Sequence, residues 1–391
     1  MKKILFVTHS ISRGGGVGKV FSILATQIAH EFDITVLERG ENNKTFPMPK
    51  TIKYLSPMFY YPERARELGQ KVHFHTVKRL LQSMFISIFP NYFHDKYIKD
   101  VYDFEISFNY LYPSIIVGAC SNKRTKKIMW IHSDIYDLSY QKYPFPQNLV
   151  SYLHFYAQRT AFKNADKIVA ISNNTRKSII DVYPFCADKV VLIPNGYNFP
   201  EMVNLSNAFS VKRNERVRFI SIGRLDSRKN VQLQIKSILL LYERGIKNVE
   251  LYILGEGEEK KRLQSIAGIY LNNGIYLQGF QRNPYPFIKS SDCLLITSKS
   301  EGFPTVAVEA MALGKPVLST PVGGMDEIIE EGINGLIFDY TPEDMATKMI
   351  HFVKSRSLYR GETISQSVTK YTDKKWGENF VELINEVNRK K

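Results

Sequence analysis

The sequence predicts an α/β fold with two doubly wound domains, and three observations lead to this prediction. The chain has 391 residues, which exceeds the size at which one hydrophobic core usually stops growing. Short apolar runs typical of buried parallel strands alternate with stretches of helical periodicity along the chain. An aperiodic segment near residue 200 divides this alternation into two series. Two parallel sheets with crossover helices are therefore expected.

The first series begins at the N-terminus, where an apolar run over residues 4–7 precedes a glycine-rich stretch at 14–18 and an amphipathic helix. Lys19 stands where a dinucleotide fingerprint has its third glycine, and Val20 stands where a P-loop has Ser or Thr. The glycine-rich stretch is therefore either a tight turn without a ligand or a different kind of binding loop. Further strands are expected at residues 32–37, 52–55, 103–108, 127–131, 168–171 and 190–193.

The second series begins after residues 198–214, which lack periodicity and are typical of a linker. About five strands are expected, at residues 217–222, 249–254, 275–278, 293–297 and 316–319. We therefore expect an N-terminal domain over 1–200, a linker over 201–215, a C-terminal domain over 216–370 and a final helical segment over 371–391.

A short helix is predicted from about Pro304, since proline suits a first helical turn and Gly314 suits the left-handed residue beyond the end. Residues 306–313 are apolar except Glu309, which predicts a buried helix with one carboxylate. Glu301 precedes this helix, whose free N–H groups offer an anion site. An anion site flanked by carboxylates suits a nucleotide sugar, in which a diphosphate joins a ribose to a hexose. The alternative is that a neighbouring cation satisfies Glu309 and that Glu301 is a solvated loop residue.

Two cations follow the first strand of the second domain. Arg224 and Lys229 come after a strand-end glycine and can converge on one anion, Arg with a planar fork and Lys with a compact charge. The alternative is a pair of solvated surface cations. Gly255 also follows a strand, where a backbone can approach a ligand or simply turn.

His132 follows directly on the strand predicted at 127–131, at the edge where open α/β sheets bind ligands. A lone histidine is usually structural, so this position is what makes it a candidate. Asp134 and Asp137 are nearby but could equally begin a helix, because Asp is a favoured cap.

These motifs resemble the retaining glycosyltransferases of family four (glycosyl transferases group 1), which have the GT-B fold. Glu301 and Glu309 are similar to that family's two glutamates separated by seven residues, and Arg224 with Lys229 to its Gly-Arg-Leu motif and following lysine. The resemblance covers nearly the full length and implies two facing domains, with the last helix crossing back to the first. It also implies that Glu301 touches the transferred sugar, that Glu309 binds the ribose and that both cations grip the donor diphosphate.

The resemblance assigns further residues. It places His132 near the transferred sugar, the glycine-rich loop across from the diphosphate, and the loop that contains Phe280 near the base. The implied catalytic residues are His132, Glu301, Arg224 and Lys229. The implied donor-binding residues are Gly15, Gly16, Gly18, Arg224, Lys229, Gly255, Phe280, Glu301, Gly302, Phe303, Pro304, Thr305 and Glu309.

The implied reaction moves a hexose or N-acetylhexosamine from a nucleoside-diphosphate sugar to an acceptor hydroxyl, with retention of anomeric configuration. UDP is the commonest nucleotide in the family, and GDP is the alternative. No Asp-x-Asp triplet occurs in the sequence, so we expect no metal and no other cofactor, and the cations of the chain would neutralise the diphosphate.

The net charge of +15 predicts an anionic partner. Between residues 60 and 99, basic residues accompany apolar and aromatic ones, which suits a surface that rests on anionic lipid. The alternative for this region is a core-packing helix with a solvated basic face. We expect a glycan or polyprenyl-linked acceptor of the capsule or O-antigen type at the inner face of the cell membrane. Nucleic acid is not an expected partner, because no aromatic-basic recognition motif occurs.

The three cysteines, Cys120, Cys186 and Cys293, are far apart, so their spacing supports neither a disulfide nor a zinc site. A reducing cytoplasm is therefore expected, and the N-terminal apolar run is too short for a signal peptide. Two other functions fit the same pattern. A GT-B-like nucleotide-sugar epimerase would need additional acid/base groups, and a catalytically silent nucleotide-sugar or membrane-binding module would be expected to lose one of the four charged site residues.

Overall fold

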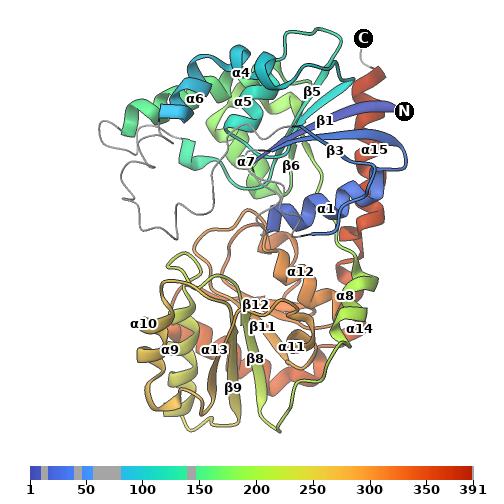
Figure 1. The fold of residues 1–391 in the computed structure, drawn as a ribbon. Helices are drawn as coiled ribbons and strands as arrows, with labels where there is room; N and C mark the ends of the chain where they lie inside the picture. The colour runs from blue at the N-terminus through green and yellow to red at the C-terminus, as the bar shows by residue number, and fades with distance from the viewer. Residues whose placement is uncertain (10–15, 39–45, 56–80, 139–146, 390–391) are drawn as a thin grey trace, which may run out of the picture. The chain divides into compact units, whose positions relative to one another are not determined.

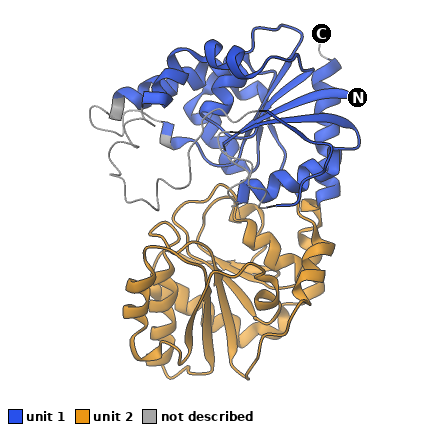
Figure 2. Ribbon diagram, in the orientation of Figure 1, with its two compact units in different colours: residues 1–196, 373–391 blue, residues 197–372 orange. Residues whose placement is uncertain are grey.

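The computed structural model describes residues 1–9, 16–38, 46–55, 81–138 and 147–389. The chain forms two compact units: unit 1 is Met1–Gly196 with Asp373–Lys391, and unit 2 is Tyr197–Thr372 (Figure 2). The segment before residue 215, which lacks periodicity in the sequence, contains a helix, α8 (Phe199–Ser206). Asn198 caps this helix by accepting a hydrogen bond of 3.0 Å from the N–H of Glu201. An eight-residue helix spans barely two turns, which is too short to show periodicity.

Unit 1 is built on a seven-stranded parallel sheet with the order β3-β2-β1-β4-β5-β6-β7 (Figure 1). All the strands expected in the first series are present, with ends shifted by one or two residues. They are β1 (Lys2–Thr8), β2 (Phe32–Glu38), β3 (Lys53–Tyr54), β4 (Phe104–Ser107), β5 (Lys126–Ile131), β6 (Lys167–Ala170) and β7 (Val190–Leu192). Their alternation with helices follows the predicted doubly wound pattern.

The helices of unit 1 bury their apolar sides on this sheet. In α1, the predicted stripe of Val20, Phe21, Leu24 and Ile28 is buried. The α-helices with printed bounds are α1 (Gly16–Ile28), α4 (Pro90–Tyr97), α5 (Tyr112–Gly118), α6 (Gln147–Asn164), α7 (Asn173–Val182) and α15 (Asp373–Arg389), and η1 (Tyr136–Leu138) and η3 (Pro184–Lys189) are short 3₁₀ turns. Residues 81–88 are also helical.

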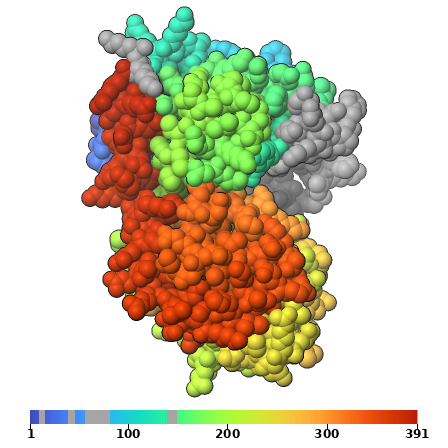
Figure 3. Space-filling view, turned by 180° about the vertical axis from the view of Figure 1, so that it is seen from behind, coloured from blue at the N-terminus to red at the C-terminus, as the bar shows by residue number. Residues whose placement is uncertain are grey.

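The C-terminal helix α15 belongs to unit 1 and completes its core. Trp376 packs edge-on against Trp130 with ring centroids 6.0 Å apart, and Phe380 stacks on Trp130 at 5.9 Å and on Phe6 at 6.1 Å. The amide of Gln27 on α1 donates a hydrogen bond of 3.0 Å to Asp373. In Figure 3 the red C-terminal segment accordingly lies along one flank beside blue N-terminal atoms.

Unit 2 is built on a six-stranded parallel sheet with the order β10-β9-β8-β11-β12-β13. The expected five strands are present, and the edge strand β13 was missed because it has only three residues and begins with glycine. The strands are β8 (Val217–Ile222), β9 (Val249–Leu254), β10 (Ile275–Gly279), β11 (Cys293–Ile296), β12 (Val317–Ser319) and β13 (Gly335–Ile337). The α-helices are α8, α9 (Val231–Glu243), α10 (Lys260–Ala267), α11 (Tyr285–Lys289), α12 (Thr305–Ala312), α13 (Pro342–Ser355) and α14 (Gly361–Ser367), joined by η4 (Gly268–Tyr270), η5 (Met325–Glu327), η6 (Arg356–Leu358) and η7 (Thr369–Tyr371).

The three cysteines are free thiols and all three are buried, which confirms that they form no disulfide. Within the described residues, no helix has both the length and the hydropathy that crossing a membrane requires.

Candidate active site

Helix α12 forms where the sequence predicts it. Pro304 lies just before the first helical residue with φ −76°, and Gly314 lies beyond the end in the left-handed region with φ +72°. Glu309 is buried among Ala307, Val308, Ala310 and Met311. Pro304, at the N-cap position, makes no side-chain hydrogen bond to the backbone N–H groups that begin α12. Its side chain therefore does not cap the positive end of the helix dipole.

Lys229 and Glu301 form an ion pair at the carboxyl edge of the unit 2 sheet. The Lys229 ammonium contacts Oε1 of Glu301, and the Ser298 hydroxyl donates a hydrogen bond of 2.7 Å to the same oxygen. Both charged side chains are largely buried, with exposed fractions of 22% and 11%. Because burial strengthens the interaction of opposite charges, this pair holds both groups in place. Ser298 was not anticipated, since a lone serine three residues before Glu301 carries no recognisable signal.

The backbone around Lys229 is also fixed by hydrogen bonds. The N–H of Lys229 donates to Oδ1 of Asp226 at 3.0 Å, and its carbonyl accepts from the Thr297 hydroxyl at 2.9 Å. A cavity of about 20 Å³, with room for about one water molecule, borders the ion pair. It is lined by residues of four segments, including Gly223, Lys229, Ser298, Glu301 and Pro304. The strand-end glycine, the cation and the start of α12 therefore line the same cavity.

Arg224 is placed differently from Lys229. Its side chain is exposed directly after β8, whereas the neighbouring Leu225 is buried. Both cations thus lie at the same edge of the sheet, but only Lys229 is brought into contact with Glu301. An exposed guanidinium at a carboxyl strand end is accessible to an anionic ligand.

Two glycines allow neighbouring loops at this edge to touch. A Cβ on Gly255, which has φ +147°, would lie 1.8 Å from the carbonyl oxygen of Gly223. A Cβ on Gly323, which has φ +55°, would lie 2.5 Å from the Cβ of Glu301. No other residue fits these positions without a shift of the backbone, so both glycines position the loops that carry the charged side chains.

The remaining donor-binding candidates of unit 2 lie around α12 and β10. Phe303 is buried and its ring lies 5.5 Å from that of Tyr371, so its side chain anchors the loop. Thr305 and Gly302 are partly exposed at the start of α12, and Phe280 is 73% exposed in the loop after β10. Of these four residues, only Phe280 therefore has an exposed aromatic ring that a ligand could contact.

Tyr197 is a neighbour of Glu309 that the sequence did not single out. Its side chain is 1% exposed, and its hydroxyl has no hydrogen-bond partner among the described residues. Burial, with a further contribution from the Glu309 charge, raises the pKa of Tyr197 well above its ordinary value. The hydroxyl therefore stays protonated and available as a donor.

His132 lies in unit 1 directly after β5, as predicted. Its ring packs against Phe108 with centroids 4.3 Å apart, and its Nε2 is buried without a hydrogen-bond partner among the described residues. Burial lowers the pKa of His132 from 6.5 to about 3, so the imidazole is neutral at physiological pH. A neutral ring carries one N–H donor and one acceptor nitrogen but supplies no positive charge.

The glycine-rich stretch is described only in part. Gly16 begins α1 with open space around it, and Gly18 is buried within the helix. Gly15 lies outside the described residues. Asp134 is partly exposed before η1, and Asp137 lies within that 3₁₀ turn.

Comparison with known families gives a clear match for both halves of the chain. The model described as Glycosyltransferase Family 4 matches residues 14–199, and the model described as Glycosyl transferases group 1 matches residues 204–367. The chain belongs to the family 4 glycosyltransferases. The resemblance that the motifs at Arg224, Lys229, Glu301 and Glu309 suggested is thereby confirmed.

Individual members of the family are only moderately similar. An uncharacterized glycosyltransferase of Methanocaldococcus jannaschii is 32% identical over 51% of this chain and 49% of its own length. N-acetyl-alpha-D-glucosaminyl L-malate synthase of Bacillus anthracis is 26% identical over 54% of this chain and 56% of its own length. The chain thus spans about half the length of these curated relatives, although another Methanocaldococcus jannaschii glycosyltransferase matches over 90% of its length at 26% identity.

Solved structures match over the whole chain. The HepE protein of Anabaena in complex with UDP has a TM-score of 0.69 at 16% identity, and covers 98% of this chain and 100% of its own. The apo lipopolysaccharide outer core galactosyltransferase WaaB has a TM-score of 0.68 at 17% identity, over 98% of this chain and 99% of its own. The predicted fold class, two doubly wound domains of the GT-B type, is confirmed by this likeness.

Proposed function

We propose that the chain is a retaining glycosyltransferase that moves a hexose or N-acetylhexosamine from a UDP-sugar to a hydroxyl of a glycan or lipid-linked glycan. The observation that carries the proposal is the Lys229–Glu301 ion pair beside the start of α12. In this proposal the cation binds the diphosphate and the carboxylate binds the hexose. A relative named N-acetyl-alpha-D-glucosaminyl L-malate synthase and a structural neighbour solved in complex with UDP support the choice of donor.

In this proposal the bond between the anomeric carbon and the diphosphate breaks, and the acceptor oxygen bonds to the same face of the sugar. The acceptor proton passes to the departing phosphate. Arg224, Lys229 and the positive end of α12 would stabilise the negative charge that develops on the leaving group. Each such group contributes about 3 kcal/mol to the transition state, on the order of a hundredfold in rate.

The carboxylates would recognise hydroxyl groups. Glu301 would accept from the transferred sugar, oriented by Ser298, while Lys229 offsets its charge. Glu309 would accept from the ribose. His132, as a neutral imidazole, would hydrogen-bond the sugar without adding positive charge.

Calorimetric titration with UDP, GDP and ADP, each in EDTA and then with magnesium, tests the donor assignment. We expect binding of UDP that is unchanged by EDTA, because the cations of the chain replace a metal at the diphosphate. Binding of none of the three nucleotides would overturn the proposal, and binding of UDP without transfer from any UDP-sugar would favour an epimerase or a silent binding module.

The acceptor side of the proposal includes attachment to an anionic membrane surface. Apolar and aromatic side chains are 48–61% exposed along residues 81–92 of unit 1, namely Leu81, Phe85, Ile88, Phe89 and Tyr92. Ser83 contacts His154 at 2.5 Å, which joins this segment to α6, where Tyr152 and Tyr156 are also exposed. On the same segment Ile86 is 3% exposed and packs in the core of unit 1, as the core-packing alternative expects, so the proposal rests on the exposed side chains alone. The basic residues expected before position 81 lie outside the described residues.

Co-sedimentation with vesicles tests this attachment. We expect the full chain to pellet with phosphatidylglycerol vesicles but not with phosphatidylcholine, and to be released as salt shortens the screening length. The double change Phe85→Ser and Phe89→Ser should reduce pelleting, whereas Ile269→Ser, an equally apolar exposed position in unit 2, should not. Equal binding to both kinds of vesicle would remove the anionic surface from the proposal, and binding to neither would remove the membrane.

A further inference from the structure

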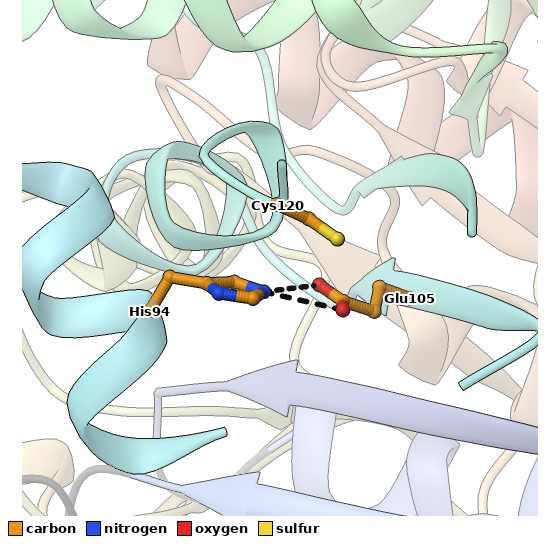
Figure 4. Close-up of side chains that lie close together, drawn as sticks. All are labelled: His94, Glu105 and Cys120. Carbon is orange, nitrogen blue, oxygen red and sulfur yellow. Dashed lines mark hydrogen bonds and ion pairs between the residues drawn. The ribbon is translucent and has the colours of Figure 1, made fainter. Parts of the chain in front are cut away.

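A histidine, a glutamate and a cysteine from three different elements meet in the interior of unit 1 (Figure 4). His94 lies on α4, Glu105 on β4, and Cys120 two residues beyond the end of α5. The three residues are 7%, 2% and 6% exposed. Nε2 of His94 lies 3.0 and 3.2 Å from the Glu105 oxygens, and each residue offers one ligand atom such that all three lie within 4.8 Å of one another.

The histidine ring is oriented by a second carboxylate. Nδ1 of His94 lies 3.0 Å from Oδ1 of Asp95, so Nε2 is directed at Glu105 and Cys120. A carboxylate on the far nitrogen is the usual way in which a metal-binding histidine is held. The amide of Asn91, on the same helix, donates a hydrogen bond of 3.3 Å to the carbonyl of Ala119, which fixes the segment that carries Cys120.

A pocket borders the cluster at Cys120. It has a volume of about 430 Å³, and Cys120 is one of the residues in its wall, together with Ser87, Asn91 and Asn164. Glu105 pairs in register with Lys127 at the beginning of β5, whereas His132 follows the end of that strand. At about 3.3 Å per residue, the cluster lies roughly 16 Å along the sheet from the edge that carries His132.

We propose that His94, Glu105 and Cys120 bind one divalent transition-metal ion, with zinc as the ion that this donor set suits best. Thiolate, imidazole and carboxylate are the three side-chain ligands of zinc. A thiolate and a carboxylate together neutralise a divalent ion in a region that excludes water. Bonds of about 2.0–2.3 Å to one ion hold ligand atoms roughly 3.5 Å apart, so a movement of about an ångström completes the site.

Binding of the ion requires an exchange of protons. Two protons pass to solvent as the ion binds: the Cys120 thiol proton and the Nε2 proton of His94 that is shared with Glu105. The hydrogen bond between His94 and Glu105 is then replaced by bonds from both residues to the ion. The ion would tie α4 and the end of α5 to β4 in unit 1. This site is separate from Lys229 and Glu301, so it does not depend on the proposed sugar transfer and assigns no metal to the diphosphate.

Cobalt(II) provides the direct test, because a cobalt–thiolate bond gives a charge-transfer band in the near ultraviolet. The full chain, freed of metal with EDTA under reducing conditions, is titrated with cobalt and then with zinc. We expect one equivalent of cobalt to produce the band and one equivalent of zinc to remove it. Asp95→Asn should weaken cobalt binding by about tenfold to a hundredfold, as loss of a supporting carboxylate does elsewhere.

Two variants assign the band to the cluster. Cys120→Ser should abolish it, whereas Cys186→Ser, which changes another buried thiol of unit 1, should leave it unchanged. Absence of the band from the folded wild-type chain at stoichiometric cobalt would overturn the proposal without any variant. Persistence of the band in Cys120→Ser would overturn it as well. Zinc should also raise the melting temperature of the wild-type chain, and EDTA should reverse this increase.

Discussion

For Glu301 the proposed chemistry predicts a change in catalytic rate without a change in nucleotide binding. Its carboxylate is held by Lys229 and Ser298, and a change to glutamine removes the negative charge while keeping an oxygen that can accept from Ser298. We expect Glu301→Gln to lower kcat by about a hundredfold and to change UDP affinity little, since the interaction is made to the sugar. Glu362→Gln, on α14, is the matched control. An unchanged kcat in Glu301→Gln would remove this residue from the catalytic set.

Arg224 and Glu309 should act on nucleotide binding instead. We expect Arg224→Met and Glu309→Gln each to weaken UDP binding by about tenfold or more, because a hydrogen bond to a charged group contributes about 1.5–3 kcal/mol. Calorimetric titration of the two variants measures the effect. Affinities equal to that of the wild type in both would show that the diphosphate and ribose lie elsewhere.

His132 should make the stability of unit 1 sensitive to acid. Burial lowers its pKa from 6.5 to about 3, so between these values the unfolded chain binds a proton that the native chain does not. Stability from this group is present above pH 6.5 and is lost as the pH falls, by about 2 kcal/mol at pH 5. Urea unfolding at pH 7 and pH 5 should show a smaller loss in His132→Asn than in the wild type. An equal loss in both would contradict the lowered pKa.

The sequence predicted which residues belong to the candidate site but not which of them contact one another. Arg224, Lys229, Glu301 and Glu309 could be selected because each stands at a strand end or on a short apolar helix. That Lys229 contacts Glu301, 72 residues away, depends on the order of strands in the sheet. The cluster of His94, Glu105 and Cys120 was missed for the same reason, since its members come from three elements and show no metal-binding spacing.

Among the elements, the loop after β9 offers a test of how the site is supported. A Cβ on Gly255 would overlap the Gly223 carbonyl, whereas a Cβ on Gly245, which follows α9 with φ +81°, would meet nothing within 4 Å. We expect Gly245→Ala to cost only about 1 kcal/mol of backbone strain, and Gly255→Ala to cost about 1–3 kcal/mol more. Denaturant unfolding of the two variants measures the difference. Equal losses would mean that the two loops separate easily.

Elements of ordinary length were predictable because each carries a repeated signal. Strands such as β1 and β8 are continuous apolar runs, and α1 shows its buried stripe directly. The misses are β13, with three residues, and α8, with eight. Strand β13 pairs with β12, and helix α8 packs on α11 and α12. Both elements are thus stabilised by tertiary contacts, which give no periodic pattern in the local sequence.

For the whole molecule, the four charged residues proposed to bind the donor, Arg224, Lys229, Glu301 and Glu309, all belong to unit 2. We therefore expect UDP to stabilise unit 2 more than unit 1, by about 2.7 kcal/mol at a hundredfold excess over Kd. Hydrogen exchange followed by mass spectrometry should show the greatest protection by UDP at the connection between β8 and α9 and at α12. Protection confined to unit 1 would place the nucleotide elsewhere.

Unit 1 is interrupted in the sequence by the whole of unit 2, because α15 supplies Trp376 and Phe380 to its core. During synthesis on a ribosome, the strands of unit 1 emerge before unit 2, whereas their packing partner α15 emerges after it. All residues of unit 2 are available before that point. Domains usually fold in the order in which they are made. Here unit 2 can complete its core before unit 1, because the core of unit 1 is incomplete until α15 has been made.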